Sequence, residues 1–129
     1  YTDRISRRQI IPCLVRVPVP DTADFLAVIS DRNSSSAMKR LQRTAAEYVP
    51  HLAVVSYAVP YSGYLVPQTR LSDHTSFWDA GYPALMLTDT AMFRNPNYHT
   101  PRDTSATLDY GFMTDVARVV TAALLTFQG

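Results

Sequence analysis

The sequence predicts an α/β fold in which helices pack against a mostly parallel sheet. Three short apolar runs alternate with three helical patterns along the 129 residues, and this alternation is typical of α/β layering. The apolar runs are nearly continuous, as expected for strands that are buried on both faces. With 47% apolar residues, the chain can bury one core, and its length suits a single domain.

The first strand is expected after an entry segment that contains several prolines. Residues 1–24 hold prolines at positions 12, 18 and 20. Because proline cannot donate to a sheet ladder, the apolar run Ile10–Val19 is expected to be extended or at a sheet edge. Phe25–Ile29 is short and apolar, which predicts a buried strand. Asp31–Ser35 then supplies turn and N-cap residues.

The middle of the chain predicts a helix, a strand and a second helix. Apolar residues at helical spacing indicate a helix over Ser35–Val49, and the apolar run Leu52–Val59 indicates the next strand. Ser72 is a suitable N-cap for a short helix over Asp73–Ala80. Gly81 suits the carboxyl end of that helix, where a left-handed residue is common.

The last part of the chain predicts a strand, a long loop and a helix. Pro83–Thr88 is an apolar run, and Asp89–Asp109 shows neither helical nor strand periodicity. Compact domains rarely keep a loop of that length without a function. Asp109 is placed to cap a final helix over Tyr110–Phe127. We expect one apolar stripe on that helix, formed by Phe112, Val116, Val119, Val120, Ala123, Leu124 and Phe127.

Charge and composition exclude several classes of partner. The formal net charge is +1, which gives no basis for predicting a nucleic-acid partner. Cys13 is the one cysteine, so neither a disulfide within the chain nor a Cys/His metal motif is predicted. The most apolar helical stretch, Ala117–Phe127, is too short to span a membrane.

His99 is the strongest candidate for chemistry. It lies in the long loop between Pro96 and Pro101, which restrict the backbone on either side. Loops that follow a strand often carry the ligand-binding groups of α/β proteins. Asp103 either orients the imidazole of His99 or closes an Asx-turn. Tyr98 either takes part in the site or packs under the loop.

The other candidate groups have simpler interpretations. His51 is expected on the surface, and His74, which follows Asp73 in the first turn of a short helix, is expected to cap or to make a supporting hydrogen bond. Ser62–Gly63 lacks the preceding glycine of a nucleophile elbow. Glu47, the one glutamate, lies within an amphipathic helix, so a carboxylate pair for acid–base catalysis is not predicted.

Several motifs, in order, resemble the co-catalytic zinc aminopeptidases. They are Leu-Ser-Asp-His-Thr-Ser-Phe-Trp at 71–78, Gly-Tyr-Pro-Ala-Leu at 81–85, Asn-Pro-Asn-Tyr-His-Thr at 95–100, and Asp103-Thr104. Together they are similar to the C-terminal part of the bacterial leucyl aminopeptidase and aminopeptidase Y group, which is related to glutamate carboxypeptidase II. The similarity extends from about Phe25 to the end of the chain.

The resemblance implies a partial three-layer α/β/α sandwich and a peptidase with two zinc ions that removes N-terminal residues from peptides. In such enzymes the metals polarise the carbonyl and lower the pKa of water, and a glutamate moves the proton. His99 matches the last zinc ligand, and Tyr98 matches a tyrosine whose hydroxyl stabilises the tetrahedral intermediate. Asp73, His74 and Asp103 match positions near the site with supporting roles.

The remaining zinc ligands and the catalytic glutamate of that family lie upstream of the matched region. One histidine cannot hold a catalytic zinc, which usually has three protein ligands, and a sheet of three strands leaves open edges. We therefore expect residues 1–129 to be the C-terminal part of a single peptidase domain, with 1–24 as an extended entry segment and 25–129 as the α/β portion. This part alone is expected to be inactive and not to hold zinc tightly.

The expected partners are a peptide with a free N-terminus and the missing N-terminal half of the same domain. An alternative is a noncatalytic peptidase-like domain that serves in binding or interaction. A third hypothesis is a hydrolase that uses His99 with Asp103 alone, and the lack of a nucleophile disfavours it. Relatives in this family are often secreted or envelope-associated, whereas the sequence itself predicts no compartment.

Overall fold

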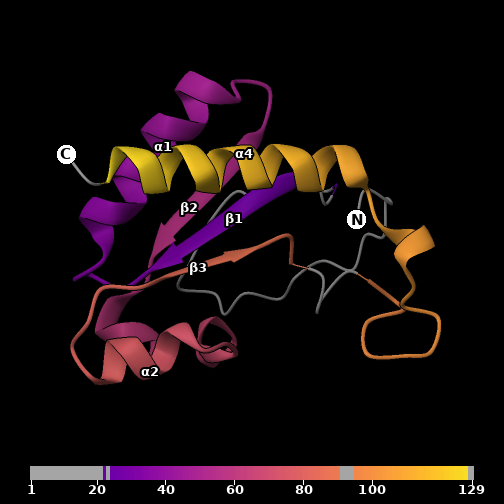
Figure 1. Cartoon of the computed structure of the whole chain (residues 1–129). Helices are drawn as coiled ribbons and strands as arrows, with labels where there is room; N and C mark the ends of the chain where they lie inside the picture. The colour runs from indigo at the N-terminus through magenta and orange to yellow at the C-terminus, as the bar shows by residue number, and fades with distance from the viewer. Residues whose placement is uncertain (1–21, 23, 91–94, 128–129) are drawn as a thin grey trace.

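A computed structural model describes residues 22, 24–90 and 95–127 of the chain (Figure 1). Within these ranges every predicted strand and helix is present, with ends shifted by one or two residues. The expected edge segment Ile10–Val19 lies outside the described residues. The strands are β1 (Phe25–Ser30), β2 (Ala53–Ala58) and β3 (Leu85–Thr88); the helices are α1 (Ser35–Tyr48), α2 (His74–Asp79) and α4 (Tyr110–Thr126); short 3-10 turns are η1 (Pro60–Gly63), η2 (Pro67–Arg70) and η3 (Ser105–Thr107).

The described sheet is mixed and has the order β2-β1-β3. β1 and β2 are parallel and are joined through α1 in a βαβ unit, because parallel neighbours need a crossover connection. β3 is antiparallel to β1, with Leu85 opposite Ser30 and Thr88 opposite Ala27. The connection from β2 therefore brings the chain back beside the carboxyl end of β1. The α/β class predicted from the sequence is confirmed, and the antiparallel direction of β3 refines it.

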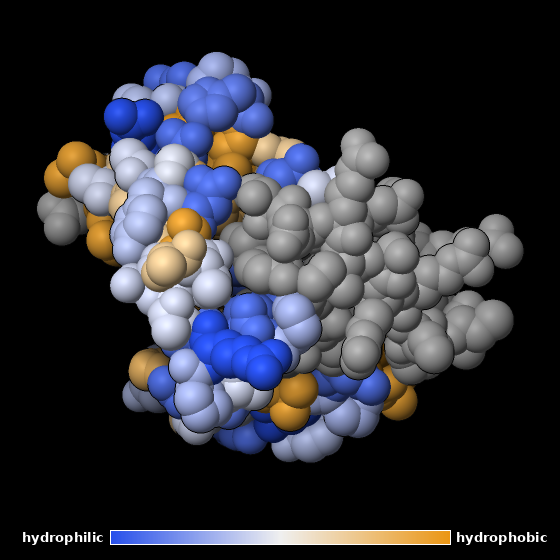
Figure 2. Space-filling view, turned by 90° about the vertical axis from the view of Figure 1, so that its right-hand side faces the viewer, coloured by the Kyte–Doolittle hydropathy of each residue, from blue (hydrophilic) through white to orange (hydrophobic). Residues whose placement is uncertain are grey.

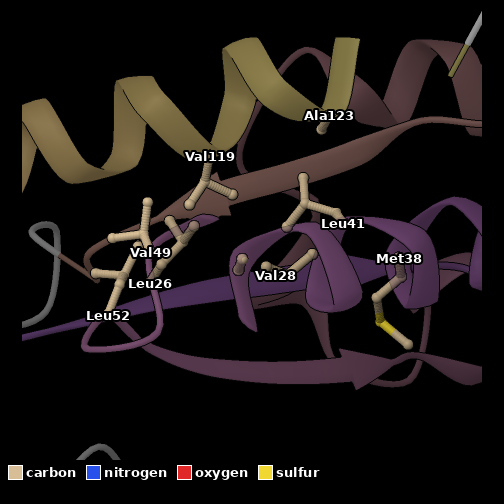
Figure 3. Packing of buried hydrophobic residues seen from close by; sticks show 9 residues of the cluster. Leu26, Val28, Met38, Leu41, Val49, Leu52, Val119 and Ala123 are labelled. Atoms are coloured by element: carbon tan, nitrogen blue, oxygen red, sulfur yellow. The ribbon is translucent and has the colours of Figure 1, made fainter. Parts of the chain in front are cut away.

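β1 is buried on both faces because apolar elements cover it from two sides. Leu26 and Val28 point toward α1 and α4, where they pack with Leu41 and Val119 (Figure 3). On the opposite face, Phe25 and Ala27 are also buried. Figure 1 shows α1 and α4 on one side of the sheet and α2 on the other. The continuous apolar pattern of this strand thus has a direct structural cause.

A buried polar network connects the start of α1 to the approach of β3. The Asp31 carboxylate accepts hydrogen bonds from the backbone N–H (2.8 Å) and the hydroxyl of Ser34. The Ser34 hydroxyl oxygen in turn accepts a hydrogen bond from the backbone N–H of Ala84 (2.9 Å). Both side chains are buried, so these bonds satisfy groups that are costly to leave unpaired. The turn predicted at Asp31 is therefore also connected, through Ser34, to Ala84 at the approach to β3.

The helix ends agree with the sequence in two places and differ in one. The Asp109 side chain accepts a hydrogen bond from the Phe112 N–H (2.9 Å), as predicted for the N-cap of α4. Gly81 has φ +81°. Its N–H donates to the carbonyl of Trp78, and the N–H of Tyr82 donates to the carbonyl of Phe77. These two bonds form the Schellman motif at the end of α2. The predicted cap at Ser72 was wrong, because α2 begins one residue later and Asp73 is its N-cap.

The predicted apolar stripe of α4 is only partly buried. Val119 and Ala123 lie in the core, and Phe112, Val116 and Phe127 pack against it. Leu124, however, is 62% exposed, so the predicted apolar stripe is wider than the part of it that the core covers.

Among the described residues, no helix is both long and apolar enough to cross a membrane.

Candidate functional site

Residues 95–104, in the loop that follows β3, form a series of tight turns held by their own hydrogen bonds. The Tyr98 N–H donates to the Asn95 carbonyl (3.2 Å), the Thr100 N–H to Asn97 (2.9 Å), and the Asp103 N–H to Thr100 (3.0 Å). The Asn95 side chain also accepts from the N–H of Asn97 (2.8 Å). The sequence shows no helical or strand periodicity over 89–109, and the described part of this loop contains the short 3-10 turn η3. Residues 95–104 pair several of their backbone groups with one another.

His99 is exposed and has a left-handed backbone, with φ +57°. Its ring stacks on that of Tyr98, with centroids 4.0 Å apart and planes 14° from parallel. A left-handed residue with a side chain costs roughly 1–2 kcal/mol, and such strain is concentrated at functional sites. Figure 1 shows the segment beyond the end of β3, and Figure 2, which views this side, shows a mostly hydrophilic described surface.

Asp103 closes the segment instead of orienting the imidazole. Its carboxylate accepts a hydrogen bond from the Asn95 side-chain amide (3.3 Å), which joins the two ends of the turn series. Among the described contacts there is no hydrogen bond between Asp103 and His99, and none that makes Asp103 the head of an Asx-turn. The structure therefore brings Tyr98, His99 and Asp103 into one loop, where only the first two are in direct contact.

His74 lies apart from this loop, on α2. Its Nε2 donates to the Thr69 carbonyl (2.8 Å), and its ring meets Trp78 edge-on at 4.4 Å. A carbonyl only accepts, so Nε2 carries a proton, while the buried Nδ1 has no hydrogen-bond partner among the described residues. The neighbouring Asp73 is exposed. These contacts give His74 a local role, and the supporting roles predicted for both residues beside a metal stay predictions.

Arg70 is the centre of an interaction network that the sequence did not reveal. Its guanidinium donates to both carboxylate oxygens of Asp79 (2.8 and 2.6 Å) and to the carbonyl of Ser62 (2.6 Å), and it stacks over the Tyr64 ring at 4.1 Å. The hydrogen bond from Arg70 lowers the pKa of Asp79. Ser62 and Tyr61 have left-handed backbones, and Arg70 holds this strained turn against α2.

The three histidines occupy three separate places. His51 lies at the start of β2 and is 2.7 Å from the carboxylate of Asp115 on α4. His74 is buried against α2, and His99 is exposed on the loop after β3. Within the part of the chain that the structure describes, no group of three or more His, Cys, Asp or Glu side chains is arranged to hold a metal. An imidazole is a suitable zinc ligand, and His51 and His99 are both exposed, but the described residues do not group either of them with further ligands into a complete site.

Comparisons with known proteins agree with the motifs of this loop. The model of the family described as Peptidase family M28 matches residues 19–124. The uncharacterized protein YfbL of Escherichia coli (strain K12) is 37% identical over 97 residues, which are 75% of this chain and 29% of that protein. The chain thus spans less than a third of the length of this relative. No solved structure matches the chain significantly.

Replacing His74 tests its role in fixing η2 to α2. His74→Gln keeps an amide donor that can reach the Thr69 carbonyl, whereas His74→Ala removes the donor and leaves a cavity beside Trp78. We expect His74→Ala to lower the free energy of unfolding by about 2–4 kcal/mol and His74→Gln by less. Urea unfolding followed by the fluorescence of Trp78 measures both, and equal losses would contradict this role.

The ion pair of Arg70 and Asp79 predicts a specific acid sensitivity. Because the pKa of Asp79 is lower in the folded chain, the pair stabilises the fold above the unfolded-state pKa, and this contribution is lost as the pH falls through the folded-state pKa. Asp79→Asn is therefore expected to make the fall in stability at acidic pH shallower. Unfolding in urea at a series of pH values below neutrality measures it. Arg70→Met removes the same pair and should have the same effect, and an unchanged slope in both variants would exclude the pair as the cause.

Proposed function

Because the chain belongs to peptidase family M28, we propose that it is the C-terminal part of a zinc-dependent aminopeptidase domain in which His99 is a zinc ligand. The observation that carries this proposal is the exposed His99 imidazole, stacked on Tyr98 in a strained and internally bonded turn. The family includes zinc-dependent aminopeptidases and carboxypeptidases, and the family model extends over this turn.

The presentation of His99 suits a metal ligand. Its backbone is fixed by the turns on either side, so little conformational entropy remains to be lost when the imidazole binds. The stacked Tyr98 ring limits the rotation of the imidazole while leaving it exposed. When bound, zinc polarises a carbonyl and lowers the pKa of water. In this proposal, the described part of the chain contributes one zinc ligand, an imidazole nitrogen of His99.

We propose that the other ligands and the general base come from polypeptide outside this chain. Glu47, the one glutamate, is exposed on α1 and belongs to a different element from His99. The described residues hold no cluster of metal-binding side chains, and the chain spans 29% of the length of its E. coli relative. We propose that residues 25–129 are the α/β portion of the domain and that a longer polypeptide completes the site.

Tyr98 has a separate proposed role in the reaction. Its hydroxyl is a neutral donor next to the proposed ligand, and its ring is held by His99. A donor in that position can stabilise the negative charge that develops on the carbonyl oxygen during attack by water. The proposed substrate is a peptide with a free N-terminus, and Asp73, His74 and Asp103 are proposed as supporting residues.

A noncatalytic peptidase-like binding domain is the second candidate. Residues 22, 24–90 and 95–127 contain no metal cluster, which is compatible with this candidate as well as with the first. The two candidates differ in what the complete protein binds. The proposed zinc aminopeptidase binds zinc and cleaves aminoacyl substrates, whereas a noncatalytic binding domain does neither.

Zinc binding distinguishes the isolated chain from the complete protein. Titration of zinc into the 129-residue chain in a calorimeter is expected to show no submicromolar site, because one imidazole does not hold the ion. In the complete protein, His99→Ala is expected to lower the bound zinc and to abolish the hydrolysis of aminoacyl substrates.

His51→Ala is the matched control, because His51 is also an exposed histidine but pairs with Asp115 on another part of the molecule. It should leave both zinc content and activity unchanged. Tight zinc binding by the isolated chain, or a complete protein whose zinc content does not respond to His99→Ala, would overturn the assignment.

Tyr98→Phe tests the oxyanion role without removing the ring that stacks on His99. In the complete protein we expect kcat to fall by about 100-fold or more, with little change in KM or zinc content. Steady-state kinetics on an aminoacyl substrate, together with metal analysis, measure these quantities. A variant with the kcat of the wild type would show that the Tyr98 hydroxyl is not used.

A further inference from the structure

The apolar side chains of α4 cover a wider arc of the helix than the part that packs against the core. With 3.6 residues per turn, the apolar side chains from Val119 round to Ala117 cover an arc of about 160°, whereas a surface helix usually needs about 100°. The half of the arc that contains Val119 and Ala123 packs against the core. The other half carries Met113, Ala117, Val120 and Leu124.

This second half forms a stripe along the helix, which we call the α4 stripe. Met113 is 47% exposed, Leu124 is 62% exposed, Ala117 is exposed and Val120 is partly buried. Their spacing of four, three and four residues places them on one line. No charged side chain interrupts this line, so the stripe offers a continuous apolar contact and no ion pair.

The other sides of α4 already have partners. On one flank, Asp115 contacts His51 and Arg118. On another, Arg40 of α1 donates to the Thr126 carbonyl and lies over the Phe127 ring. Apart from the isolated Leu125, the α4 stripe is therefore the exposed apolar side of this helix.

We propose that the α4 stripe is the docking surface for an amphipathic helix of the part of the peptidase domain that lies outside this chain. A line of side chains at helical spacing packs best against a second helix, whose ridges fit between them. Most of the length of the E. coli relative lies outside the matched region. This inference rests on the proposed function, because the same outside part is proposed to supply the remaining zinc ligands.

The incomplete metal site favours this occupant over a second copy of the chain. A second copy would cover the α4 stripe, but it would bring another set of the same described residues, which contain no metal cluster. The polypeptide that supplies ligands near His99 must also be held against this chain, and the stripe provides an apolar surface for that contact.

A photo-crosslinking amino acid at position 113 or 124 tests the proposal in the complete protein, expressed in full from its own gene. We expect crosslinks to a helix of the same domain outside residues 1–129, identified by mass spectrometry. Position 125 is the matched control, because Leu125 is 74% exposed on the same helix but lies off the stripe. Its crosslinking yield should be several-fold lower.

Crosslinks from positions 113 and 124 to α4 of a second copy, or yields no higher than at position 125, would overturn the proposal. Failure of the proposed function gives a different result, namely a complete protein without zinc whatever the crosslinks show. The His99→Ala variant separates the two further, because it should lose zinc and keep the crosslink from position 113.

Discussion

The burial of β1 on both faces is the constraint on which the rest of this structure depends. Val28 is completely buried, with α1 and α4 covering its face of the sheet, and full burial of such a side chain contributes about 1.5–3 kcal/mol. In the described sheet, β1 is the central strand, with β2 on one side and β3 on the other. β2 and β3 pair with this strand, and α1 and α4 cover it, so the strand and the helix on either side of the candidate loop are both placed by β1.

That constraint explains how an exposed loop can hold an imidazole in a fixed place. The loop connects β3 to α4, both of which are fixed by the core around β1. At its far end, Asp109 caps α4, and residues 95–104 pair several of their backbone groups with one another. The left-handed backbone at His99 persists because these surroundings determine it. The core thus supplies rigidity, and the loop uses that rigidity to orient a surface side chain.

Periodicity and short motifs predicted what is local, and they missed what is long-range. The strand over 25–30 and the cap at Asp109 follow from patterns within a few residues. The antiparallel direction of β3 depends on where the connection from β2 ends, which no local pattern encodes. The pairing of Arg70 with Asp79 joins residues without a recognisable spacing. Leu124 fits the helical period, yet whether an apolar side is covered depends on what else is present.

Two features of this chain are costly when they are considered alone. A strained, exposed imidazole gives up stability without completing any site, and an uncovered apolar stripe on α4 leaves surface that water disfavours. Both costs disappear if one neighbouring polypeptide adds ligands to His99 and covers the stripe with a helix. The burial of the stripe would supply the association free energy, while the few polar ligands would supply geometry. Proteins commonly divide these tasks between an apolar contact and a small polar site.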